Sequence, residues 1–156
     1  MIETPQITQT VAQRYACLHL TVPAAEIRQA MGPGLREVHG ALAAQGFSSA
    51  GPWFTHHFKR PGDFFDFEIC VPLDAATPFV PEGRVQPGAW PSMRVVRTVY
   101  HGAYEGLGAA WGEFEQWIAA QGLNEALDLW EVYRVNPDSG KSPADWRTEL
   151  NRPLLD

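Results

Sequence analysis

Hydrophobic and polar residues alternate along several short segments of the chain, and this period of two is typical of β-strands. The clearest segment is residues 129–134, where aromatic and β-branched residues alternate until Asn136-Pro137-Asp138 ends the run. The same criteria predict strands at residues 6–22, 52–58, 64–71, 92–100 and 146–153, with a short one near residues 84–86.

Two other segments carry hydrophobic residues at the spacing of an α-helix. The first covers residues 24–45 and is expected to be interrupted at Gly32-Pro33-Gly34; Gly46 ends it. The second covers residues 104–121 and ends at Gly122. Its apolar stripe consists of Leu107, Ala110, Trp111, Phe114, Trp117 and Ile118.

The order strand, helix, strand, strand therefore occurs twice, and short matches support an internal repeat. Both helices end in Ala-Ala-Gln-Gly, both last strands contain Glu-x-x-x-Pro-Leu, and Trp53 and Trp130 each follow a helix. Coincidence is the alternative, since alanine-rich helix ends are common. We predict a single α+β domain over residues 1–156, with pseudo-repeats at about 6–73 and 84–154 and one antiparallel sheet. Both helices are expected on one side of the sheet and a concave ligand pocket on the other.

Alternation also predicts which side chains share a face of the sheet. The helices are expected to cover Phe65, Phe67, Ile69 and Val71 in the first half, and Trp130 and Val132 in the second. Aligning Trp53 with Trp130 then assigns the pocket face to Phe54, His56, Glu68, Glu131, Tyr133 and Glu149. Aromatic rings with carboxylates suit an apolar or cationic organic molecule. Alternatively, Glu131 is an ordinary strand residue facing water.

Composition narrows the possible functions. With 45% hydrophobic residues, the chain of 156 residues can bury a sizeable core. A net charge of −6 and only two lysines argue against direct nucleic-acid binding. The N-terminus lacks the basic and apolar regions of a signal peptide, and no apolar run is long enough to span a membrane, so we expect a cytoplasmic protein.

No motif predicts a metal or a cofactor. His56 and His57 are adjacent on a predicted strand and point to opposite faces, which makes them a poor metal pair. The glycines at 102, 106 and 108 do not have the spacing of a dinucleotide-binding loop, and we expect them instead to let the helix approach its sheet.

Three motifs together resemble the bacterial GyrI-like small-molecule-binding domain. They are Tyr100-His101-Gly102-Ala103-Tyr104-Glu105-Gly106-Leu107, Trp130-Glu131-Val132-Tyr133 and Arg147-Thr148-Glu149-Leu150-x-x-Pro153-Leu154. This family includes the DNA gyrase inhibitor protein and the effector-binding domains of multidrug-responsive transcription activators. The resemblance implies the duplicated strand-helix-strand-strand fold and lipophilic, often cationic ligands. It also implies that the central ligand-binding glutamate is Glu131, with Tyr133 on the same strand face.

Three functions follow as hypotheses. The preferred one is a stand-alone binding protein, for sensing or detoxification, in which Glu131 anchors the ligand and Tyr133, Phe54 and His56 form aromatic walls. Tyr104 and Trp111 either reach this pocket or pack in the core. The alternative is a hydrolase, since some relatives hydrolyse cyclopropanoid toxins; Glu131 would then share acid–base chemistry with Glu68 or Glu149. A protein partner such as gyrase or a regulator is the third, and direct DNA binding is not expected because the chain has no room for a helix-turn-helix domain.

Overall fold

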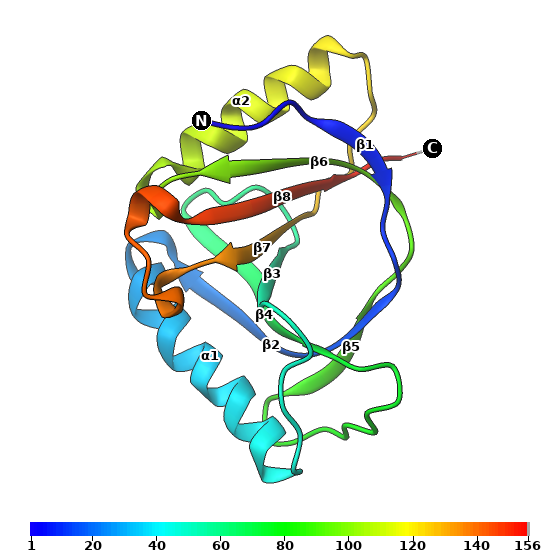
Figure 1. Cartoon of the computed structure of the whole chain (residues 1–156), viewed down its shortest axis with the longest axis vertical. Helices are drawn as coiled ribbons and strands as arrows, with labels where there is room; N and C mark the ends of the chain where they lie inside the picture. The colour runs from blue at the N-terminus through cyan, green and yellow to red at the C-terminus, as the bar shows by residue number, and fades with distance from the viewer. Residues whose placement is uncertain (156) are drawn as a thin grey trace.

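The computed structural model describes residues 1–155, and over these residues eight strands form one antiparallel sheet with two α-helices (Figure 1). This confirms the predicted α+β class. The helices are α1 (Ile27–Ala44) and α2 (Leu107–Ala120). The strands are β1 (Gln6–Gln9), β2 (Gln13–Pro23), β3 (Phe54–His57), β4 (Phe64–Leu73), β5 (Gln86–Trp90), β6 (Arg94–His101), β7 (Leu129–Val135) and β8 (Arg147–Pro153).

The order of strands in the sheet is symmetric about the pair β3 and β7. From one edge to the other it reads β1-β6-β8-β7-β3-β4-β2-β5. Strands β2, β3 and β4 with α1 make the first half, and β6, β7 and β8 with α2 make the second. The two edge strands are exchanged between the halves, because β1 pairs with β6 and β5 pairs with β2. The origin of the halves by duplication stays a prediction.

Both helices lie on the same face of the sheet, as predicted (Figure 1). Ile69, Thr55, Glu131 and Leu150 are successive cross-strand partners, so their side chains share one face. Ile69 packs in a core with Val38 and Leu42 of α1, and Leu150 packs in a core with Phe114 and Ile118 of α2. The predicted cover of the Phe67, Ile69 and Val71 face by a helix is therefore confirmed.

The prediction that a helix covers Trp130 and Val132 is wrong. Phe54 pairs with Val132 and His56 pairs with Trp130, so these four side chains lie on the face opposite the helices. That face is filled by aromatic rings: the Trp130 ring stacks on Trp90 at 4.3 Å between centroids and on His56 at 3.8 Å. The expected concave ligand pocket on this face is thus replaced by a third packed core.

Several element boundaries differ from the sequence prediction. The strand predicted at residues 6–22 is divided at residues 10–12 into β1 and β2. α1 is continuous through Pro33, where an interruption was expected. Gly34 explains why this helix lies close to the sheet, since an added Cβ would come within 2.5 Å of the Ile69 side chain. The short strand of the connector begins at Gln86, later than predicted.

Among residues 1–155, neither helix has the length and apolar character needed to cross a lipid bilayer.

Candidate functional site

A cavity of about 680 Å³ opens on the helical face of the sheet, with residues of both α1 and α2 in its walls. α1 packs over the first half of the sheet and α2 over the second, and the cavity lies between these two cores. It is lined by Ile27, Arg28, Met31, Gly32, Leu35, Trp53, His57, Arg60, Pro61, Gly62, Phe65, Tyr104, Glu105, Leu107, Gly108, Trp111, Leu129, Glu131, Tyr133, Asn136, Pro137, Asp138 and Trp146. The pocket is therefore on the opposite face from the one predicted.

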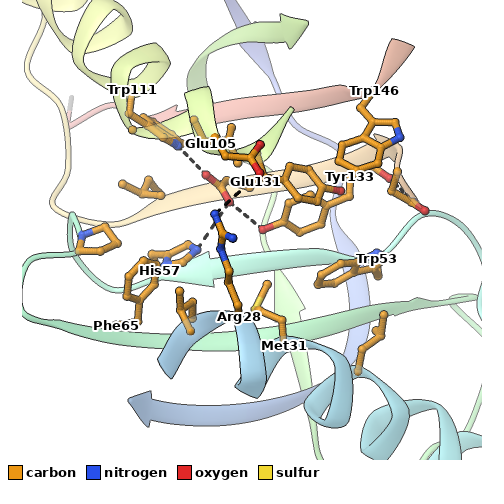
Figure 2. Close-up of a pocket in the computed structure, with 18 of the residues that line it drawn as sticks. Arg28, Met31, Trp53, His57, Phe65, Glu105, Trp111, Glu131, Tyr133 and Trp146 are labelled. Carbon is orange, nitrogen blue, oxygen red and sulfur yellow. Dashed lines mark hydrogen bonds and ion pairs between the residues drawn. The ribbon is translucent and has the colours of Figure 1, made fainter. Parts of the chain in front are cut away.

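The floor of the cavity carries a buried carboxylate, that of Glu131 on β7, with 8% of the residue exposed. Trp111 of α2 donates its indole N–H to Glu131 Oε2 over 2.7 Å. Tyr133 donates its hydroxyl to Glu131 Oε1, also over 2.7 Å, and Figure 2 shows both donors converging on the carboxylate. Both donors are neutral, so they orient the carboxylate without cancelling its negative charge.

His57 lies on the other side of this carboxylate and does not serve as its counter-ion at neutral pH. Its Nε2 is 3.9 Å from Glu131 Oε1, which is too long for a hydrogen bond, and 3.0 Å from Thr55 Oγ1. Burial lowers the pKa of His57 below its ordinary value, against the opposing effect of Glu131. A neutral imidazole therefore faces Glu131 in the cavity (Figure 2).

Aromatic rings form the wall at the end of the cavity away from His57 (Figure 2). The Trp53 and Tyr133 rings lie 4.2 Å apart, and the Tyr104 ring is 4.9 Å from Trp146 and 5.8 Å from Tyr133. Burial, followed by the charge of Glu131, raises the pKa of Tyr104 to about 12, so this phenol stays neutral. Electron-rich ring faces close to a carboxylate form a favourable environment for an organic cation.

The mouth of the cavity carries charged side chains that already have partners. Arg28 of α1 lies 3.8 Å from Glu105, which belongs to the short 3₁₀ turn Tyr104–Gly106 before α2. Both side chains are largely exposed, at 81% and 70%. Arg60 donates to the backbone carbonyl of Gly108 over 3.2 Å. The Arg28–Glu105 pair therefore bridges the first and second halves at the entrance.

The structure brings four of the predicted site residues together: Glu131, Tyr133, Tyr104 and Trp111 all line the cavity. The prediction that Phe54, His56, Glu68 and Glu149 share this pocket is wrong. The strand register places Phe54 and His56 beside Val132 and Trp130, and places Glu68 beside His56 and Glu149 beside Val132. These side chains consequently point away from the helices.

Two of these displaced residues, His56 and Glu68, belong to a polar cluster on the far face. His56 Nδ1 is 3.1 Å from Glu68 Oε1, and His56 Nε2 is 2.8 Å from Asp128 Oδ2. Burial alone would lower the pKa of His56, but its hydrogen bonds to Asp128 and Glu68 raise it above the ordinary value. The cluster ties β3 and β4 to the segment before β7, which is a structural role.

Glu149 is held in a separate ion-pair cluster. It contacts Arg134 and lies 3.2 Å from Arg97, and Asn151 donates to it over 2.9 Å. Both carboxylate oxygens of Glu149 therefore have partners, on the face of the sheet opposite the cavity. Neither Glu68 nor Glu149 can therefore share a bound molecule with Glu131.

Sequence reasoning missed several lining residues, among them His57, Trp53, Phe65 and Arg28. The sequence does allow His57 to be predicted, because successive side chains of a strand point to opposite faces. His57 therefore lies on the face opposite His56, together with Thr55, and this is the face that the helices cover. Nothing in the sequence predicts Arg28 and Met31 of α1, since only tertiary packing brings that helix to the cavity. Among residues 1–155, no three His, Cys, Asp or Glu side chains are placed to hold a metal ion.

An antiparallel sheet with two helices framing an aromatic cavity over a buried glutamate is the architecture of an α+β small-molecule-binding domain. The sequence matches the family model of the GyrI-like small molecule binding domain over residues 3–154. The chain therefore belongs to the GyrI-like family, which the three sequence motifs had indicated. A search of curated proteins finds no match to this chain.

Solved structures with the same fold cover nearly the whole chain. The C-terminal domain of EcmrR is 19% identical with a TM-score of 0.83, and 98% of each chain is covered. The chain spans 58% of the EcmrR chain seen in its complex with DNA. A hydrolase from Listeria innocua is 12% identical with a TM-score of 0.71, and 97% of this chain and 91% of that one are covered.

A further structure, SAV2435 bound to tetraphenylphosphonium, is 13% identical with a TM-score of 0.67, and the match covers 98% of this chain and 94% of that one. At these identities the likenesses show the fold alone.

Proposed function

We propose that this chain binds lipophilic cations in the cavity between α1 and α2, with Glu131 as the anionic anchor, for sensing or detoxification. The observation that carries the proposal is the Glu131 carboxylate, which is 8% exposed at the cavity floor and receives hydrogen bonds from two neutral donors. A desolvated negative charge of this kind is costly unless a positive charge compensates it.

The walls of the cavity support the same ligand class. Trp53, Tyr133 and Trp146 present aromatic rings to the cavity, and Met31 of α1 adds an adaptable apolar surface (Figure 2). The Tyr104 ring packs beside Trp146 in the same lining. A relative with this fold, SAV2435, has been solved with tetraphenylphosphonium, a lipophilic cation. A ligand with a cationic centre and apolar substituents would place its charge near Glu131 and its bulk against the rings.

The decisive experiment is calorimetric titration of the wild-type chain and Glu131→Gln with tetraphenylphosphonium and with tetraphenylmethane carrying a neutral solubilising group. We expect the cation to bind the wild type at least about tenfold more tightly than Glu131→Gln, and the neutral compound to bind both alike. Glu113→Gln is the matched control, because it removes the same charge from an exposed position on α2. Equal cation affinity for wild type and Glu131→Gln would overturn the proposal.

Hydrolysis of cyclopropanoid or related electrophilic toxins is the second candidate, supported by neighbours described as hydrolases from Listeria innocua. The predicted carboxylate pair cannot perform it, because Glu68 and Glu149 lie on the far face of the sheet. The chemistry would rest on Glu131 as a single general base toward water, beside the neutral imidazole of His57 at 3.9 Å. Mass spectrometry would detect a product about 18 Da heavier than the substrate, which is the mass of one added water. This product should not form with Glu131→Gln. A protein partner and a cytoplasmic location stay predictions.

A further inference from the structure

The hydrogen-bonding capacity of the Glu131 carboxylate is only half used. An ionised carboxylate has about four lone-pair sites, two on each oxygen. Trp111 fills one site on Oε2, and Tyr133 fills one on Oε1. His57 Nε2 at 3.9 Å is too distant to fill another. Each oxygen therefore keeps one open acceptor site at the cavity floor.

A buried chain of hydrogen bonds explains why His57 leaves its site on Glu131 open. Tyr133 gives its only hydroxyl hydrogen to the carboxylate, so the 2.8 Å contact between Tyr133 and Thr55 must use the Thr55 hydrogen. Thr55 Oγ1 then has a lone pair for the imidazole, 3.0 Å away, and accepts from His57 Nε2–H. The hydrogen on Nε2 is thereby directed toward Thr55 and away from Glu131.

The three donors that lie next to the carboxylate, on Trp111, Tyr133 and His57, are consequently committed. The Trp111 and Tyr133 hydrogens point at Glu131, and the His57 hydrogen points at Thr55. His57 Nδ1 has no hydrogen-bond partner among the described residues and, in this tautomer, is an acceptor. The open hydrogen-bonding sites at the floor are therefore acceptors. The Tyr104 hydroxyl in the aromatic wall has no partner among the described residues, and it can donate to a ligand or accept from one. A cation that carries N–H groups matches this floor, whereas a quaternary cation leaves both open sites of Glu131 empty.

We propose that the pocket selects cations with N–H donors, such as protonated primary amines and amidines on an apolar group, over quaternary ammonium or phosphonium ions, and that Thr55 is the positioning residue for this selectivity. The inference rests on the proposed function, since it refines the ligand class of the same cavity. Thr55 is fully buried, at 0% exposure, and does not line the cavity. It acts on the ligand only through His57 and Tyr133.

The selectivity test uses two ligands that differ only at the charged group: biphenyl-4-ylmethylammonium and its N,N,N-trimethyl derivative. We expect the primary ammonium to bind the wild-type chain about tenfold more tightly, because hydrogen bonds to a charged acceptor outweigh the greater cost of dehydrating the ammonium. Equal affinity of the two ions, with both weakened in Glu131→Gln, would overturn this inference and leave the proposed function intact. Absence of binding by both ions would count against the proposed function itself.

The role of Thr55 is tested with a near-isosteric pair of variants. In Thr55→Val the imidazole loses its acceptor, so its N–H is free to turn to Glu131 Oε1 and fill one open site. We expect the preference for the primary ammonium to fall to about twofold or less, while affinity for the trimethyl ion changes little. Thr55→Ser keeps the hydroxyl and should keep the preference.

If Thr55 has only a structural role, Thr55→Val should weaken the binding of both ions together, and this result would overturn the assignment. Full selectivity in Thr55→Val would overturn it as well. Circular dichroism checks that each variant is folded. Should Thr55→Val not fold, Thr55→Ala removes the same hydroxyl without adding a methyl group and is subject to the same two outcomes.

Discussion

Trp111 of α2 donates its indole hydrogen to Glu131 of β7 over 2.7 Å, and this bond joins the second helix to the floor of the cavity. We expect Trp111→Phe to lower the free energy of unfolding by about 2–4 kcal/mol, since it removes a donor to a buried carboxylate and part of a buried ring. Urea denaturation measures the loss. Trp117→Phe is the control, because Trp117 is only partly buried on the same helix. Equal losses in the two variants would contradict a specific contribution from the bond to Glu131.

Acid should destabilise the wild-type chain through His57. Burial lowers the pKa of His57 from the ordinary value of 6.5, so below pH 6.5 the unfolded state binds more protons than the folded state. The stability that the neutral His57 side chain contributes is complete above about pH 6.5, and it is lost as the pH falls toward the lowered pKa. We expect the free energy of unfolding to decrease over this range in the wild type and to decrease less in His57→Gln. Denaturation series at several pH values check this, and parallel curves for the two proteins would contradict it.

His56 should have the opposite pH dependence. Although burial opposes it, hydrogen bonding to Asp128 and Glu68 raises the pKa of His56, so the folded state holds the proton more tightly than the unfolded state. This stabilisation is complete below pH 6.5 and is lost as the pH rises through the raised pKa. The stability difference between wild type and His56→Gln should therefore shrink from acidic to alkaline pH. A difference that grows with pH would show that the imidazolium is not the stabilising form.

Arg28 should slow the entry of cations. It lines the cavity at its mouth, paired with Glu105 at 3.8 Å, and both side chains are largely exposed. An exposed pair contributes little to stability, so Arg28→Ala should change the free energy of unfolding by less than about 0.5 kcal/mol. It should, however, raise the association rate of a lipophilic cation roughly twofold at low salt, an effect that screening removes at high salt. Stopped-flow fluorescence measures the rate; Arg36→Ala, exposed on the same helix and outside the cavity lining, should not change it.

Gly34 and Gly40 should respond oppositely to alanine although both lie within α1. A Cβ on Gly34 would come within 2.5 Å of the Ile69 side chain, whereas a Cβ on Gly40 would meet no atom within 4 Å. We expect Gly34→Ala to cost about 1–3 kcal/mol through overpacking against the sheet. Gly40→Ala should stabilise by about 0.5–1 kcal/mol, as alanine does in an exposed helix. Thermal unfolding of both variants tests this. Stabilisation by Gly34→Ala would mean that the Ile69 side chain moves aside without lowering the free energy of unfolding.

The alternation along residues 64–71 and 129–134 predicts correctly which side chains share a face, but it does not tell which face the helices cover. Leu129, Glu131 and Tyr133 do share a face, as predicted. Both faces of β7 are buried, with Trp130 2% exposed and Glu131 8%, so hydrophobicity did not distinguish them. Glu131 nevertheless stood out in the sequence, because a carboxylate between two hydrophobic neighbours requires a polar partner wherever it is buried.

The face error came from a shift of one residue in aligning the two halves. Matching Trp53 with Trp130 set Phe54 beside Glu131, whereas matching the two Ala-Ala-Gln-Gly helix ends sets Thr55 there. The structure pairs Thr55 with Glu131 directly. A slip of one residue moves every side chain of a strand to the other face, which is why Phe54 and His56 were predicted in the pocket and Thr55 and His57 were not.

The exchanged edge strands join the two halves within one continuous sheet. β1 precedes the first half in sequence yet completes the edge beside β6 in the second, while β5 leaves the connector to complete the edge beside β2. A cut in the exposed connector at residues 75–76 would yield two fragments, each carrying an edge strand that belongs to the other. Neither fragment contains every strand of its own half of the sheet. We therefore expect the two fragments to reassociate, as domain-swapped protomers do. For the same reason the intact chain should lose its cavity and its sheet in a single cooperative transition rather than half by half.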